Sequence, residues 1–213
     1  MRTYSIIGLL GIVLALAITP AYYFAERDPN TILAQDVYGI DRAVRSLTPH
    51  VKAYTSAGGF GASLINGLPV AVGVLKIHVA NRKAYIDALI SPHLEEGPSL
   101  KVVDAVEGSV AVSIPAAVSA LIEKKAEFSS AGLRYVVLVT LKVLKYDHDS
   151  LSNTVKPKLR GPAKVVLRGD AGVKAVDDAI DEGKGEEQQE EQKEQQEQQE
   201  EQEEQEKQEE QEA

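Results

Sequence analysis

The segment from Ile6 to Ala25 limits what this chain can fold into more than any other feature of its sequence. Its 20 residues, IIGLLGIVLALAITPAYYFA, include no charged side chain. As an α-helix the segment would extend about 30 Å, which matches the hydrocarbon core of a bilayer. Helices of soluble proteins are rarely apolar on every side. The segment therefore predicts contact with a membrane.

Two interpretations of residues 1–25 stay open. In a signal peptide, Arg2 would precede the apolar stretch, and small residues around Pro20 would allow cleavage. In a single-pass anchor, the membrane-contacting side chains would include Ile6, Leu10, Val13, Leu16, Tyr22, Tyr23 and Phe24, the last three at the interface with water. Because the amino-terminal side is short, we expect the rest of the chain to be extracytoplasmic, either membrane-anchored or secreted at the cell surface.

The carboxyl-terminal region, residues 181–213, is of low complexity. Residues 186–213 hold 14 Glu, 11 Gln, 2 Lys and 1 Ala, a net charge of −12, whereas the whole chain carries −9. No apolar residue between Ile180 and Ala213 could form the seam of a coiled coil. Glutamates three and four positions apart repel one another on a helix. We expect a disordered tail or a fluctuating, solvated helix.

Residues 26–55 are expected to form a linker and a short amphipathic helix. Val37, Ile40, Val44 and Leu47 recur at three- and four-residue steps, with Asp36 as the N-cap and Pro49 just past the end. The apolar face of this helix could rest on a membrane surface. The pattern favours packing on the neighbouring domain instead.

Residues 56–180 are expected to form one mainly β domain, as a β-sandwich or an α+β fold. The clearest strand signal is Arg134–Tyr146, where apolar residues alternate. Glu107-Gly108-Ser109 has the length of a hairpin turn. Ser56–Gly67 is expected as a loop, and Ala116–Phe128 as a helix that begins after Pro115. The other expected strands are Val70–Ala80, Leu100–Val106, Val110–Ile114 and Ala163–Arg168.

The densest polar cluster, Asp147-His148-Asp149, follows the predicted long strand. Two carboxylates beside an imidazole could bind a divalent cation. A turn that ends the strand explains the same residues and is the favoured interpretation. His78, within a predicted apolar strand, is expected to be structural. No other cofactor is expected.

Several function classes are disfavoured by the sequence. The chain has no cysteine, which excludes disulfides, thiolate metal sites and thiol nucleophiles. The glycines near Phe60 lack the Lys and Ser/Thr of a phosphate loop, which argues against nucleotide binding. Aromatic residues make up only 5% of the chain, and the tail is acidic, which argues against nucleic-acid binding.

We therefore expect a non-enzymatic structural or interaction protein of the cell surface, with a membrane and a protein partner or a second copy as its contacts. The alternative is a self-assembling filament or sheath subunit, released after signal cleavage, that exchanges strands through exposed sheet edges. A metal-binding domain or an enzyme built on Asp147, His148 and Asp149 is the third and least favoured hypothesis.

Overall fold

The computed structural model describes residue 28 and residues 31–56, 58–162 and 168–185. It also describes five positions of the tail, Gln189, Gln192, Lys193, Gln196 and Gln199, which are helical and exposed. The predicted membrane segment, with Ile6, Leu10, Val13, Leu16, Tyr22, Tyr23 and Phe24, lies outside the described residues. So do most of the tail and all of the expected strand Ala163–Arg168 except Arg168, which is helical.

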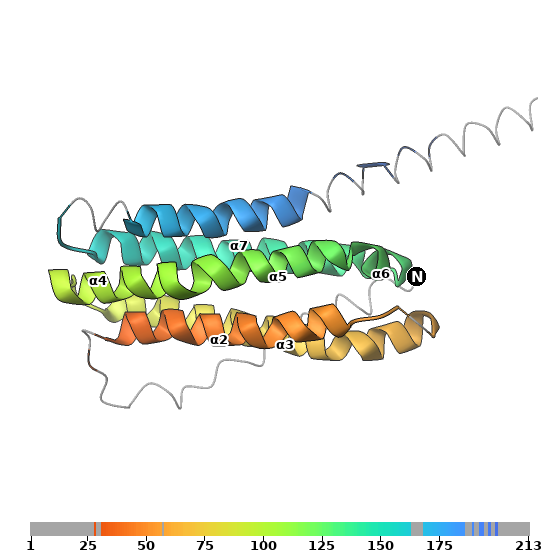
Figure 1. The fold of residues 1–213 in the computed structure, drawn as a ribbon, viewed down its shortest axis with the longest axis horizontal. Helices are drawn as coiled ribbons and strands as arrows, with labels where there is room; N and C mark the ends of the chain where they lie inside the picture. Colours follow the sequence, from red (N-terminus) through yellow and green to blue (C-terminus); the bar gives the residue numbers. More distant parts are fainter. Residues whose placement is uncertain are drawn as a thin grey trace, which may run out of the picture.

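The described residues form a bundle of long helices that run side by side (Figure 1). In chain order the elements are α2 (Ile32–Ala53), α3 (Gly59–Ile90), α4 (Glu96–Ala105), the π-helical turn η2 (Val106–Val110), α5 (Ala111–Glu123), α6 (Lys125–Ser130), α7 (Arg134–Val155), the 3₁₀ turn η3 (Lys156–Lys158) and a helical segment at 168–185. None of the described residues lies in a strand. The expected β-sandwich or α+β fold is therefore wrong.

The amphipathic helix predicted in residues 26–55 is confirmed, and it is longer than expected. Val37, Ile40, Val44 and Leu47 are all at least 91% buried, which places the apolar face of α2 in the core. Asp36 lies inside α2 rather than at its cap, and Pro49 lies within its last turns.

The expected strand Arg134–Tyr146 forms the first part of α7. The buried side chains of this helix continue past Tyr146 at helical spacing: Val137, Leu138, Leu141, Asp147, Leu151 and Ser152. Between Tyr135 and Leu144 nearly every residue is apolar. Apolar residues on both faces fit a buried strand and a buried helix equally, so alternation could not separate the two.

The expected loop Ser56–Gly67 and strand Val70–Ala80 both fall mainly within α3. The side chains that α3 buries are mostly small or polar: Ser63, Val70, Gly73, Ile77, Asn81, Ala84, Asp87 and Ala88. At Gly73 the backbone of α3 lies so close to α2 that a Cβ atom would be 2.7 Å from Leu47 Cδ1. Small residues thus allow the two helices to pack closely, and they remove the apolar stripe that would have predicted a helix.

The expected hairpin around Glu107-Gly108-Ser109 is an unbroken helical run from α4 through η2 to α5. Gly108 lies inside the π-helical turn η2 and does not end the helix. Pro115 lies inside α5 rather than at its first position. The helix expected over Ala116–Phe128 is confirmed as most of α5 together with α6, which are separated by a turn at Lys124.

The segment 168–185 packs beside α7 on the bundle (Figure 1). Val176 is fully buried and Ile180 is 96% buried. A Cβ atom at Gly172 would meet Val106, and one at Gly183 would meet Val118. Glycines on this segment therefore let it approach η2 and α5 closely, and it covers one side of the core.

Candidate functional site: an apolar cavity

The core of the bundle contains a cavity of about 120 Å³. Thirty residues line it, from α2, α3, α4, η2, α5, α7, η3, the chain just after η3 and the segment 168–185. All but six of them are apolar or glycine: the exceptions are Asp36, Asn81, His148, Ser152, Lys156 and Asp170. About 10–15 Å³ of such space holds one water molecule. The cavity is therefore large for a space with so few polar partners, and it suits an apolar ligand.

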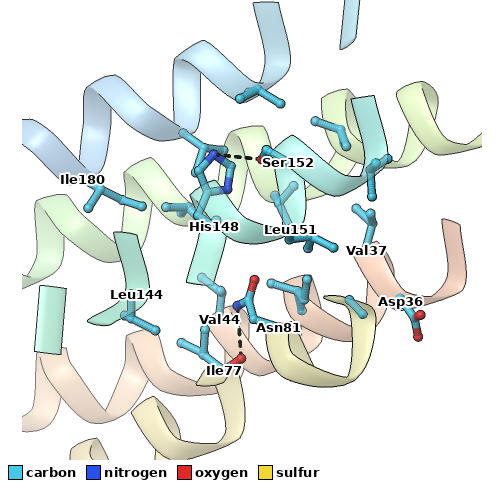
Figure 2. A pocket seen from close by; sticks show the side chains of 18 of the residues that line it. Asp36, Val37, Val44, Ile77, Asn81, Leu144, His148, Leu151, Ser152 and Ile180 are labelled. Carbon is cyan, nitrogen blue, oxygen red and sulfur yellow. Dashed lines mark hydrogen bonds between the residues drawn. The ribbon is translucent and has the colours of Figure 1, made fainter. Parts of the chain in front are cut away.

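Two polar side chains of α7, His148 and Ser152, line the cavity and lie close together (Figure 2). His148 Nε2 lies 3.5 Å from the Ser152 hydroxyl and 3.4 Å from Asp177 Oδ1. Burial lowers the pKa of His148, although Asp177 and Asp149 oppose the shift. The imidazole is therefore neutral at neutral pH and adds no positive charge to the cavity lining.

A third polar residue in the cavity lining, Asn81 on α3, forms a hydrogen bond with the backbone of its own helix. Its Nδ2 atom donates to the carbonyl of Ile77 at 3.1 Å (Figure 2). This bond turns the amide toward its own helix. One of the two amide N–H groups of Asn81 is therefore already used within its own helix.

The ion pair between Lys156 and Asp170 is a partly exposed portion of the cavity lining. Lys156 Nζ lies 3.0 Å from Asp170 Oδ1, and the two side chains are 40% and 50% exposed. Both residues also line the cavity. Both side chains therefore touch solvent and line the cavity at the same time.

Asp36 forms part of a buried charge cluster at another part of the wall. Its carboxylate and that of Asp87 both accept hydrogen bonds from Lys83. Burial raises the pKa of Asp36 to about 6, although Lys83 opposes the shift. Asp36 Oδ2 has no hydrogen-bond partner among the described residues. Two carboxylates share one ammonium, so this cluster does not favour an additional anion.

The structure does not bring together the three residues of the predicted cation site. Asp147 is fully buried between α7 and α3, where its Oδ2 lies 2.5 Å from His78 Nδ1 and its Oδ1 lies 2.8 Å from Arg82 Nε. Asp149 instead pairs with Lys145 at 2.5 Å. His148 faces the cavity. Among the described residues, no group of three or more His, Asp or Glu side chains could hold a metal ion.

The outer face of α3 is a second feature that the sequence analysis missed. Five large apolar side chains are 39–67% exposed in its first half: Phe60, Leu64, Ile65, Leu68 and Val72. No charged residue occurs between Gly59 and Leu75. By length and composition, α3 and the run Glu96–Glu123 resemble membrane-spanning helices. In the most apolar 18-residue stretch of α3, only 22% is buried in the bundle. We name these five residues the α3 apolar patch.

The comparisons with known proteins agree with a helical binding module. Residues 31–157 match the family model described as HsbA, hydrophobic surface binding protein A. No curated protein matches this chain.

Solved structures share the fold at low sequence identity. AFMP4P, solved in complex with palmitic acid, aligns with a TM-score of 0.67 and 22% identity over 74% of this chain and 99% of its own. The first ligand-binding domain of the Penicillium marneffei MP1 protein, complexed with arachidonic acids, gives 0.62 and 22% over 74% and 98%. The second domain of that protein, with multiple arachidonic acids, gives 0.62 and 21% over 76% and 97%.

Proposed function

Because this chain belongs to the HsbA family, we propose that it is a non-enzymatic, extracytoplasmic protein that binds the acyl chain of a lipid in its apolar cavity. The observation that carries the proposal is the cavity itself, which is closed around by helices and lined almost entirely by aliphatic side chains. The fatty acids in the complexes of AFMP4P and MP1 support it.

The shape of the lining also favours a chain-like ligand. Cavity-lining side chains on α7 extend from Leu141 to Val155, which is about 21 Å of helix. An extended acyl chain can contact such a wall along its whole length. Each methylene removed from water contributes about 0.8 kcal/mol, so affinity would increase with chain length.

A cavity-filling substitution tests the location of the ligand. Ala117 on α5 lines the cavity and is 94% buried, so Ala117→Phe would place a ring in the space of the ligand. We expect palmitic acid to bind the variant at least tenfold more weakly, as measured by isothermal titration calorimetry. Ala126→Phe, on the exposed side of α6, is the matched control and should bind as the unmodified chain does.

Two results of that titration would contradict the proposal. One is the absence of binding of palmitic acid to the unmodified protein. The other is equal affinity in Ala117→Phe and Ala126→Phe, which would place the ligand outside the cavity. A thermal unfolding scan of Ala117→Phe without ligand shows whether the variant folds.

The α3 apolar patch favours a second function, attachment to an apolar surface. An exposed cluster of this kind commonly marks a contact site for protein or lipid. The family description names hydrophobic surfaces, and the patch has no charge that would have to be desolvated on contact.

We expect Ile65→Ser/Leu68→Ser to adsorb less to octyl-coated beads, with palmitic acid binding unchanged. Val112→Ser/Tyr135→Ser, which removes exposed apolar side chains from other helices, is the control. Equal adsorption of the two variants would contradict this function.

A further inference from the structure

We propose that Lys156 binds the head of the lipid and makes the cavity selective for single-chain lipids with an anionic head, such as a long-chain carboxylate, over neutral lipids. In this arrangement Asp170 holds Lys156 until the lipid anion replaces it. The inference rests on the proposed function and adds to it the residue that selects the head.

The charge of the cavity wall points to Lys156. Among the described residues that line the cavity, Lys156 is the only lysine or arginine, and the imidazole of His148 is neutral. The remaining charged lining residues are Asp36 and Asp170. Asp36 lies in a cluster where one lysine already serves two carboxylates. An anionic head is therefore attracted to the wall at Lys156 and repelled at Asp36.

The position of Lys156 suits the head of an amphipathic molecule. Its side chain is 40% exposed, so a carboxylate bound there keeps part of its hydration while the acyl chain enters the apolar interior. Ser152, one helical turn earlier, also lines the cavity and is 91% buried. Its hydroxyl makes only a long contact, 3.5 Å, to His148 Nε2.

Without a lipid, the carboxylate of Asp170 forms the ion pair with Lys156 that the lipid anion would form. Its carboxylate lies 3.0 Å from Lys156 Nζ. Ion pairs between half-exposed side chains contribute little to stability because water screens them. The incoming carboxylate can therefore exchange with Asp170 at small cost, and Asp170 acts as a competitor within the chain.

The test compares palmitic acid with hexadecanol, which has a chain of the same length and an uncharged head. Titrations at pH 8, below the concentration at which the acid forms micelles, measure both affinities. Lys156→Gln should weaken binding of palmitic acid about threefold to tenfold and leave that of hexadecanol within twofold. Asp170→Asn should strengthen binding of palmitic acid about twofold to fivefold, again without an effect on hexadecanol.

The control is Lys174→Gln, which removes a positive charge from the segment 168–185, the helical segment that carries Asp170. Lys174 is 73% exposed, pairs with Asp178 and does not line the cavity. It should leave both affinities unchanged. If Lys156→Gln and Lys174→Gln weaken palmitic acid equally, or if Lys156→Gln weakens both ligands equally, the head is not bound at Lys156.

The outcomes separate this inference from the proposed function. Failure of both lipids to bind the unmodified protein contradicts the cavity as a lipid site. Binding of both lipids, with no selective effect of Lys156→Gln or Asp170→Asn, keeps the cavity function and overturns the role of Lys156. Opposite effects of the two variants on palmitic acid alone would support the exchange with Asp170.

Discussion

Asp147 is a residue whose partners lie far away in the sequence. Beside His148 and Asp149 it resembled a cation ligand, yet its partners are His78 and Arg82, more than sixty positions earlier on α3. Burial raises the pKa of Asp147, and its contacts with His78 and Arg82 oppose the shift. Only the packing of α3 against α7 decides that this carboxylate joins two helices.

Loss of that carboxylate should destabilise the fold strongly. Asp147→Ala leaves His78 and Arg82 in a mostly buried site without a counter-charge, and we expect a loss of about 3–5 kcal/mol in the free energy of unfolding. Asp149→Ala removes a carboxylate that is 42% exposed and should cost less than about 1 kcal/mol. Urea denaturation measures both. Equal losses, or a loss that appears only when divalent cations are present, would contradict the structural role.

Asp36 should make stability depend on pH in the direction opposite to an ordinary salt-bridged acid. Its pKa is about 6 in the folded protein and 3.8 ordinarily, so the folded state binds this proton more tightly. The contribution of Asp36 is therefore complete below about pH 4 and is lost as the pH rises through about 6, a difference of roughly 3 kcal/mol.

The variant Asp36→Asn isolates this effect. As the pH increases from 4 to 7, the unmodified chain should lose stability relative to Asp36→Asn. The free energy of unfolding of the variant minus that of the unmodified chain should therefore increase. Asp41→Asn, which alters another buried acid of α2, is the control. A difference for Asp36→Asn that does not vary with pH would show that this carboxyl has no raised pKa.

At the scale of the helices, α3 buries mostly small residues and leaves several of its large apolar side chains exposed. Sequence reasoning assumes that large apolar residues face the core, but α3 places Ser63, Gly73, Asn81 and Ala84 there. The same small residues let α2 approach. The sequence of α3 therefore shows no apolar stripe at helical spacing. In contrast, α2 buries its aliphatic face, and its helical pattern could be recognised from sequence.

Gly73 provides a test of this close approach. Alanine normally stabilises a helix interior by up to about 1 kcal/mol relative to glycine. At position 73 a methyl group would meet Leu47 at 2.7 Å, so we expect Gly73→Ala to destabilise by about 1–3 kcal/mol. Gly61→Ala, in the same helix with nothing within 4 Å of the new Cβ, should be neutral or stabilising. Thermal unfolding of both variants measures the contrast, and a stabilised Gly73→Ala would refute it.

At the scale of the whole molecule, the segment 168–185 closes the cavity and is joined to the bundle by charges as well as by Val176 and Ile180. Arg168 pairs with Asp104 at 2.7 Å and with Glu107 at 2.5 Å, and Lys145 pairs with Asp177 at 2.9 Å. These contacts connect residues far apart in the sequence. Local opening of the segment would expose the cavity to solvent and ligand.

Removal of the Arg168 contacts should therefore make opening more frequent. We expect Arg168→Gln to show faster amide hydrogen exchange in residues 168–185 and faster release of bound palmitic acid, with exchange in α2 unchanged. Lys174→Gln, which breaks a pair within the segment itself, should behave as the unmodified chain does. Faster exchange throughout the bundle would indicate general destabilisation and would contradict local opening of the segment 168–185.

The sequence by itself determined the properties that depend on composition and on short range: the apolar amino-terminal segment, the acidic tail, the helix α2 and the absence of thiol chemistry. It did not determine the helical class of the middle region, because valine-rich runs suit a buried strand and a buried helix alike. The cavity, the ion pair of Lys156 with Asp170 in its lining and the buried contacts of Asp147 were decided by the tertiary structure. Each depends on residues that only the packing of distant helices brings within a few ångströms of one another.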